Sequence, residues 1–154
     1  MRDTIVINDN VISDSDCEYL IDFYKENGST HNWLNYSVMS ISPPGNERIR
    51  EILSKVIEIL NLQVEIDWCE IAKRPPGSGH PEHVDDVKDE TIFTSVTYLN
   101  DNFTGGKTYI VDDIIVSPKK GRTLYFDGSN HKHGVSEVSG CDRYTLAVWY
   151  KHHD

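Results

Sequence analysis

The chain has 154 residues, and its 15 Lys and Arg against 25 Asp and Glu give a formal net charge of −10. This length predicts a single domain with one substantial core, and we expect no second domain. The negative charge disfavours nucleic acids and anionic membrane surfaces as partners, because both are themselves anionic.

The cysteines and the first ten residues bear on the compartment. Cys17, Cys69 and Cys141 are odd in number and lack a CxxC spacing, so we expect reduced thiols rather than disulfides or a zinc knuckle. The opening residues contain no apolar signal-peptide core, and no later apolar run approaches the ~18 residues that a membrane span needs. We therefore expect a soluble, cytoplasmic protein, whose oligomeric state the sequence leaves open.

In chain order, the first third of the sequence is typical of helices. Capping side chains at 13–16 precede an apolar face with helical spacing, which predicts a helix that ends near 27–28. A turn at 43–45 opens a second predicted helix over about 46–60, whose apolar face is formed by Ile49, Ile52, Leu53, Val56 and Leu60.

From residue 64 onward the pattern changes to short runs rich in β-branched and aromatic residues. These runs predict strands at 64–71, 92–99, 107–111, 114–116, 122–126 and 143–150. Turn signals at short intervals favour a β-sandwich or jelly roll over a parallel α/β sheet. The predicted fold class is mainly β with N-terminal helices (α+β). We expect a single domain over 1–154, with helical support at about 1–62 and a jelly-roll core at about 63–151.

The triplet His83-Val84-Asp85 is the main candidate for a functional site. If this segment ends in or beside a strand, its first and third side chains lie on one face, because the side-chain period of a strand is two. His133, which we place in a loop before the last long strand, can add a second imidazole. Two imidazoles and one carboxylate with open positions are the ligand pattern of non-haem iron(II) oxygenases.

Each of these residues also has an ordinary explanation. An HxD in a chain with seven histidines is more often a solvated loop than a metal site, and a strand arginine such as Arg143 is usually a surface ion-pair partner. The joint order of the motifs makes the metal interpretation specific. This order is HxD, Gly-Gly, PKKG, the distal histidine, an arginine ten residues later and an apolar strand.

At these motifs the chain resembles the 2-oxoglutarate- and iron(II)-dependent oxygenases of the prolyl 4-hydroxylase superfamily. The matching segments extend over roughly residues 65–150 and read HVDD at 83–86, SVTYLNDNFTGGKTYI at 95–110, VSPKKGRTLYF at 116–126, HGVSEVSG at 133–140 and RYTLAVWY at 143–150. The resemblance implies a double-stranded β-helix, a cupin-like jelly roll whose open end holds iron.

The resemblance also assigns the metal ligands. It implies that His83, Asp85 and His133 bind iron(II). His131 competes with His133 for the distal position. It lies 12 rather than 10 residues before Arg143, and the family spacing of nine or ten favours His133.

The resemblance implies a second set of residues for the cosubstrate. Arg143 would pair with the distal carboxylate of 2-oxoglutarate, because its planar fork can engage a carboxylate with two hydrogen bonds. Tyr98 would assist at the same carboxylate, and Thr108 and Thr145 are further candidates for this pocket. One position departs from the family pattern, since Arg74 stands where a tyrosine usually precedes the HxD.

The implied activity is that of a dioxygenase that hydroxylates a peptidyl prolyl residue of a protein or peptide substrate and releases succinate and CO2. The cofactors are Fe(II), 2-oxoglutarate and O2, with ascorbate as an additional one. We expect the loops at 73–82 and 86–91 to form the substrate rim, and the acidic pairs at 85–86 and 89–90 to favour neutral or basic peptides. Arg74 works against this preference, since a cation at the mouth can receive a carboxylate.

Other functions stay open at this point. The substrate can be another amino-acid residue or a small metabolite, or the chain can be a non-catalytic metal-binding jelly-roll module. A nucleic-acid demethylase of the same cofactor class is disfavoured, because Trp149 stands where such enzymes carry a further arginine.

Overall fold

The computed structural model describes residues 4–41, 45–85 and 91–152. Helices α1 (Asp14–Asn27) and α2 (Glu47–Glu58) occupy the two predicted places. Ser13 caps α1 by accepting a hydrogen bond from the Asp16 backbone, and Asn46 caps α2 in the same way from Ile49. The predicted turn at 43–45 lies mostly outside the described residues. None of the described helices is long and apolar enough to cross a membrane.

The described strands form three antiparallel sheets. Their bounds are β1 (Val6–Asn8), β2 (His31–Asn32), β3 (Ser37–Ser40), β4 (Val64–Arg74), β5 (His80–His83), β6 (Thr91–Tyr98), β7 (Thr104–Gly105), β8 (Thr108–Ile110), β9 (Ile114–Val116), β10 (Thr123–Phe126), β11 (His133–Val135), β12 (Val138–Ser139) and β13 (Arg143–His152). The major sheet has the order β1-β10-β6-β13-β4-β3-β2, the minor sheet β5-β11-β8-β9, and β12 pairs with β7. The chain is therefore mainly β with N-terminal helices, as predicted.

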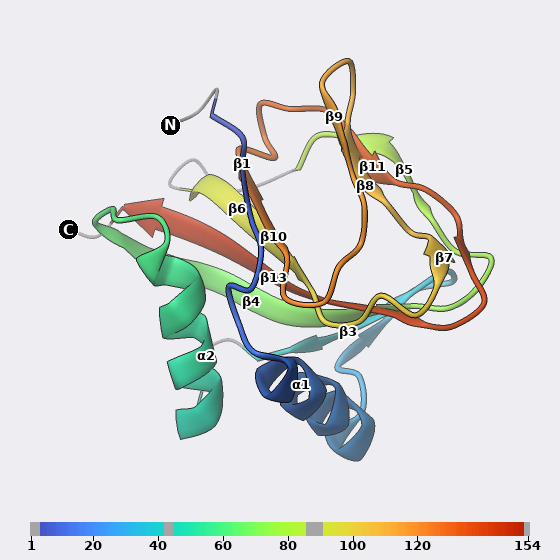
Figure 1. Ribbon diagram of the computed structural model, residues 1–154, viewed down its shortest axis with the longest axis horizontal. Helices are drawn as coiled ribbons and strands as arrows, with labels where there is room; N and C mark the ends of the chain where they lie inside the picture. Colours follow the sequence, from blue (N-terminus) through green and yellow to red (C-terminus); the bar gives the residue numbers. More distant parts are fainter. Residues whose placement is uncertain (1–3, 42–44, 86–90, 153–154) are drawn as a thin grey trace.

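The helices and the minor sheet lie on opposite sides of the major sheet (Figure 1). One apolar core fills the space between the helices and the major sheet, and it joins helix residues such as Leu20 and Ile52 to Ile71 of β4 and Leu146 of β13. A smaller core lies around Leu124, Phe126 and Ile110, towards the minor sheet.

Successive side chains of the long strands point to opposite faces of the major sheet, so one face carries the core and the other lines a pocket. Along β13 the side chains of Leu146 and Val148 enter the helix-side core, whereas those of Arg143 and Trp149 line a pocket on the other face. On β4, Arg74 likewise lines the pocket, and its neighbours follow the same alternation. The long strands thus carry an apolar face for stability and a polar face for chemistry.

Three features of the fold differ from the predictions. The predicted loop at 73–82 is partly strand, because Lys73 and Arg74 end β4 and His80–His83 forms β5. The first third of the chain is not only helical, because β1, β2 and β3 extend both edges of the major sheet. His133 was predicted to lie in a loop, and this is wrong: it begins β11 and pairs with His83 of β5. Both β5 and β11 are short and carry polar residues, so neither shows the alternation that marks a strand in the sequence.

Candidate active site

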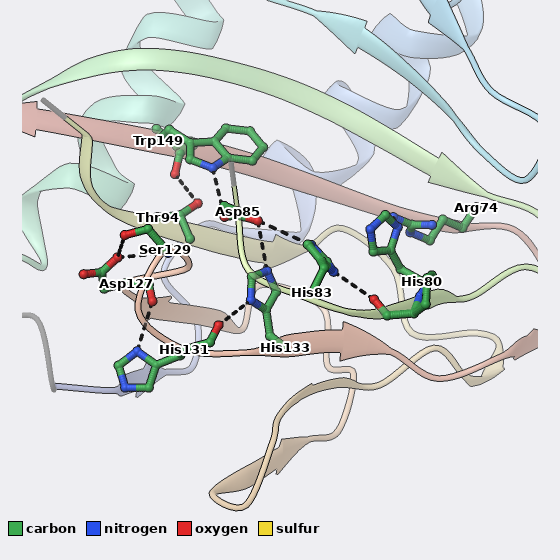
Figure 2. A network of polar contacts seen from close by, with 12 residues as sticks. Arg74, His80, His83, Asp85, Thr94, Asp127, Ser129, His131, His133 and Trp149 are labelled. Atoms are coloured by element: carbon green, nitrogen blue, oxygen red, sulfur yellow. Dashed lines mark hydrogen bonds and ion pairs between the residues drawn. The ribbon is translucent and has the colours of Figure 1, made fainter. Parts of the chain in front are cut away.

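Three side chains from the minor sheet meet at one point (Figure 2). His83 ends β5, Asp85 follows it by two residues, and His133 is paired with His83 across the ladder. The Asp85 Oδ1 atom lies 3.4 Å from His83 Nε2 and 3.2 Å from His133 Nε2. Within the described part of the chain, these residues form the one group of at least three His, Cys, Asp or Glu side chains whose possible metal-ligand atoms all lie within 4.8 Å of one another.

Contacts outside this triad fix its orientation. His83 Nδ1 lies 2.8 Å from the Pro81 carbonyl oxygen, and His133 Nδ1 lies 2.8 Å from that of His131. Each imidazole therefore carries a proton on Nδ1, which leaves Nε2, the atom that faces Asp85, as the nitrogen available to a metal ion. The Trp149 indole donates to Asp85 Oδ2 over 3.3 Å. Two imidazole nitrogens and one carboxylate, all held in place, fit a divalent iron ion.

The charges in the triad favour a cation at its centre. Burial raises the pKa of Asp85, but the interactions with His133, Trp149 and His83 together lower it by more, so this pKa lies below its usual value. Burial lowers the pKa of His133, and the contacts with Asp85 and the His131 carbonyl together raise it by more. Asp85 is therefore ionised at neutral pH, although it is mostly removed from water.

Because Gly128 has no side chain, the Asp85 carboxylate can occupy the space next to it. A Cβ atom at this position would overlap the Asp85 carboxylate and approach His133 Cε1 to 3.3 Å. The Gly128 carbonyl also accepts a hydrogen bond of 2.9 Å from the Asp85 backbone. In the sequence Gly128 is only a local turn signal, which does not reveal that it borders the triad.

His131 and His133 have different surroundings. The His131 ring hydrogen-bonds through Nδ1 to the Asp127 carbonyl at 3.0 Å, and its own carbonyl positions the His133 ring. The side chain that joins His83 and Asp85 is that of His133. His131 therefore contributes a backbone contact to the triad.

Arg143 is buried beside the triad at the start of β13. Its Nε donates to the Gly106 carbonyl and its Nη2 donates to Thr108 Oγ1, both over 2.9 Å. Burial lowers the pKa of Arg143, but a guanidinium begins so high that it stays charged. In the described residues no carboxylate pairs with Arg143, so a buried cation faces the pocket without an anion from the chain.

Thr108 and Tyr98 form a hydrogen-bonded pair behind Arg143. The Tyr98 hydroxyl donates to Thr108 Oγ1 and accepts from the Thr108 backbone, each over 2.9 Å, and the Tyr98 ring lies 5.2 Å from the Arg143 guanidinium carbon. Thr108, Thr145 and Arg143 line the pocket, whereas Tyr98 is fully buried behind them. The geometry thus places Thr108 next to the pocket and Tyr98 one layer further away.

A pocket of about 210 Å³ joins these groups between the two sheets. The triad forms one wall, and Arg143 and Arg74 approach from the major sheet. The two arginines are direct cross-strand partners on β13 and β4. Arg74 is 8% exposed, and Figure 2 shows it beside His80, which in turn lies next to His83.

The hairpin β2–β3 adds residues that the sequence did not single out. Tyr36 lines the pocket, and the Arg74 guanidinium carbon lies 4.1 Å from the centre of its ring. Trp33 stacks on the outer side of Tyr36 with ring centroids 4.9 Å apart. Of the predicted rim loops, 73–82 contributes Arg74 and His80 to the pocket, while 86–90 lies outside the described residues.

Comparisons with known proteins agree with this geometry. The sequence pattern of the 2OG-Fe(II) oxygenase superfamily matches residues 69–151. Prolyl 3-hydroxylase 1 of Rattus norvegicus and of Mus musculus is 30% identical to the chain in an alignment of 95 residues, and the match covers 47% of this chain. The match spans only 13% of the length of these curated relatives.

Solved structures share the fold over nearly the whole chain. A viral collagen prolyl hydroxylase from Paramecium Bursaria Chlorella virus-1, in its 2-oxoglutarate complex, aligns with a TM-score of 0.81 at 21% identity and covers 97% of this chain and 96% of its own. A Trichoplax adhaerens prolyl hydroxylase in complex with a hypoxia inducible factor peptide fragment aligns with a TM-score of 0.77 at 20% identity and covers 96% and 83%. The fold is thus the double-stranded β-helix, and the chain belongs to the 2OG-Fe(II) oxygenase superfamily.

Proposed function

We propose that the chain is a 2-oxoglutarate- and Fe(II)-dependent dioxygenase that hydroxylates a prolyl residue within a peptide. The observation that carries this proposal is the meeting of two complementary sites in one pocket. His83, Asp85 and His133 supply a facial donor set, and Arg143 supplies a buried cation without a carboxylate partner among the described residues. A ligand with one carboxylate for Arg143 and one chelating end for the metal fits both sites at once.

The family uses Fe(II), 2-oxoglutarate and O2, and bound together these supply the oxidant while 2-oxoglutarate is converted to succinate and CO2. His83, Asp85 and His133 would hold the metal from one side and leave its other side towards the pocket. Arg143 would fix the distal carboxylate, and Thr108 would keep the guanidinium in place through its hydroxyl. The two sheets would limit the entry of water, so that the oxidant reacts with the substrate.

The prolyl substrate is supported by the relatives. Prolyl 3-hydroxylase 1 and the viral and Trichoplax structures are prolyl hydroxylases by name, and the last of these holds a peptide fragment. In this chain the aromatic ring of Tyr36 lines the pocket and Trp33 stacks on it, so that the pocket offers a flat apolar surface to a pyrrolidine ring. The substrate is thus proposed to be a chain segment that enters past the β2–β3 hairpin.

The test is turnover by the Fe(II)-loaded protein with 2-oxoglutarate in air. Proline-containing peptides should each gain one oxygen atom by mass spectrometry, in proportion to the succinate released, while the same peptides with alanine in place of proline should not. His83→Ala should remove both products, whereas His152→Ala, at the exposed end of β13, should leave them unchanged. Turnover confined to free amino acids would reject the peptide substrate, and succinate release without any hydroxylated product would reject prolyl hydroxylation.

A further inference from the structure

Arg74 is a buried cation that the proposed chemistry does not use. It lines the pocket from β4, directly opposite Arg143 in the ladder, and is only 8% exposed. Throughout the described ranges, no carboxylate lies within ion-pair distance of its guanidinium. Buried arginines are ordinarily paired, because an isolated charge loses its hydration without compensation.

The guanidinium is nevertheless held in one orientation. Nη1 donates to the Gly79 carbonyl over 3.1 Å, Nη2 lies 3.0 Å from His80 Nδ1, and the ring of Tyr36 covers one face at 4.1 Å. A guanidinium can only donate, so the Nδ1 atom of His80 that faces it accepts and carries no proton, which leaves this imidazole neutral. All three partners are neutral, so they orient the charge without balancing it.

The charges of the pocket indicate that an anion is missing there. Burial first, and then the neighbouring Arg143, lower the pKa of Arg74 to about 10, so Arg74 stays protonated at neutral pH. A dianionic 2-oxoglutarate with Asp85 would balance a divalent metal and Arg143. Arg74 would remain without a counterion.

Glu70 does not supply this counterion. It lines the same face of β4, but its Oε1 atom accepts a hydrogen bond from the Trp68 indole, and it forms no ion pair with Arg74. Burial also raises the pKa of Glu70, which favours its neutral form. The anion is therefore expected from outside the described chain.

We infer that Arg74 forms a carboxylate subsite for the primary substrate, next to the position of the reacting residue. This inference rests on the proposed function and narrows its substrate class to prolyl compounds that carry a carboxylate close to the proline. The placement of Arg74 supports this assignment, because it contacts His80 and the His80 ring lies 4.2 Å from that of His83. A carboxylate on Arg74 would therefore anchor the substrate beside the metal triad.

Three sources of that carboxylate share this chemistry, and matched probes separate them. N-acetylproline against its amide tests a chain end. The dipeptide N-acetyl-Pro-Glu amide, compared with N-acetyl-Pro-Gln amide, tests an acidic residue after the proline. N-acetyl-Glu-Pro amide, compared with N-acetyl-Gln-Pro amide, tests an acidic residue before it. Each pair differs only in carboxylate against carboxamide, so any preference reports the charge.

The experiment is calorimetric titration of these probes into the nickel-loaded full chain saturated with 2-oxoglutarate, which needs no turnover. The acid of at least one pair should bind about tenfold more tightly than its amide, since it alone pairs with the buried charge. Arg74→Gln should bring the two members of that pair within about twofold, and Arg74→Lys should retain part of the preference. Lys73→Gln is the matched control, because Lys73 is the adjacent residue on β4 and pairs instead with Asp142.

The subsite would be overturned by equal or absent binding of all three pairs by the unaltered chain, or by a preference that survives Arg74→Gln. A loss of 2-oxoglutarate affinity in Arg74→Gln as large as in Arg143→Gln would also overturn it, since Arg74 would then belong to the cosubstrate site. A different result would reject the proposed function and leave the subsite standing. Acid-selective binding with no hydroxylation of any prolyl probe by the Fe(II) form would keep the subsite and reject prolyl hydroxylation.

Discussion

At the scale of single residues, Gly128 shapes the metal site by having no side chain. Gly128→Ala should weaken nickel binding by at least about tenfold, because the added methyl group would displace the Asp85 carboxylate from its place between the two imidazoles. Calorimetric titration without air measures this change. Gly45→Ala is the control, since a Cβ there meets nothing within 4 Å. An unchanged nickel affinity in Gly128→Ala would contradict the observed position of Asp85.

Arg143 should act on the cosubstrate and not on the metal. Arg143→Gln removes the charge that would face the distal carboxylate, and breaking such a buried pair costs about 3–5 kcal/mol. The dissociation constant of 2-oxoglutarate should therefore rise by more than about a hundredfold, while nickel affinity stays nearly constant. Thr108→Val should raise the dissociation constant of 2-oxoglutarate less, because this change removes only the acceptor that orients Nη2 of Arg143. Equal loss of nickel binding in Arg143→Gln would instead indicate a folding role for the arginine.

At the scale of elements, Asp16 joins the two helices beneath the major sheet. Its carboxylate lies 2.6 Å from Lys55 Nζ on α2, and it completes the capping box of α1 with Ser13. Asp16→Asn should lower the free energy of unfolding by about 1–2 kcal/mol, measured by urea denaturation at pH 7. Asp22→Asn, an exposed change on the same helix, should have little effect.

The effect of Asp16 should depend on pH. Burial raises the pKa of Asp16, but the contacts with Lys55 and Ser13 lower it by more, so the folded-state pKa lies below the ordinary 3.8. The stabilisation is then complete above pH 3.8 and is lost as the pH falls through the folded-state pKa. The difference between the unaltered chain and Asp16→Asn should therefore shrink in acid. A difference that stays constant down to that pKa would show that the charge does not stabilise the fold.

The elements also show where sequence reasoning succeeds. Both helices and the long strands could be predicted, because their caps and their periodicity are local signals that lie within each segment. The hairpin β2–β3 and the strands β5 and β11 could not. Their residues are mostly polar or lack alternation, as in His80–His83, and they become strands only through pairing with distant partners.

At the scale of the whole molecule, the site spans two sheets that come from distant parts of the chain. His83 and His133 lie on the minor sheet, and Arg143 lies on the major sheet. Ligands that join both sheets should stabilise the fold by mass action, by about 2.7 kcal/mol at a hundred times the dissociation constant. Nickel should raise the melting temperature, and 2-oxoglutarate should raise it further only when nickel is present. An equal shift by 2-oxoglutarate without metal would contradict a ligand shared by the two sites.

The triad and Arg143 could be singled out before the fold was known, because their spacing in the sequence follows strand geometry and a family pattern. The contributions of Tyr36 and Gly128, and the hydrogen bond that joins the predicted residues Tyr98 and Thr108, could not, because these depend on the packing of one sheet against the other. Arg74 was noticed only as a departure from the family pattern. Its burial, and the neutral partners that surround it, are properties of the assembled pocket.

The contact between Trp149 and Asp85 has a practical consequence. A metal bound by Asp85 as proposed would lie within a few ångströms of this indole, and an open-shell metal at that distance quenches fluorescence. Trp33 and Trp68, the other two indoles, are 52% and 38% exposed and should emit at longer wavelength from the surface. The blue edge of the emission spectrum would thus report occupancy of the proposed metal site, without a label or a substrate.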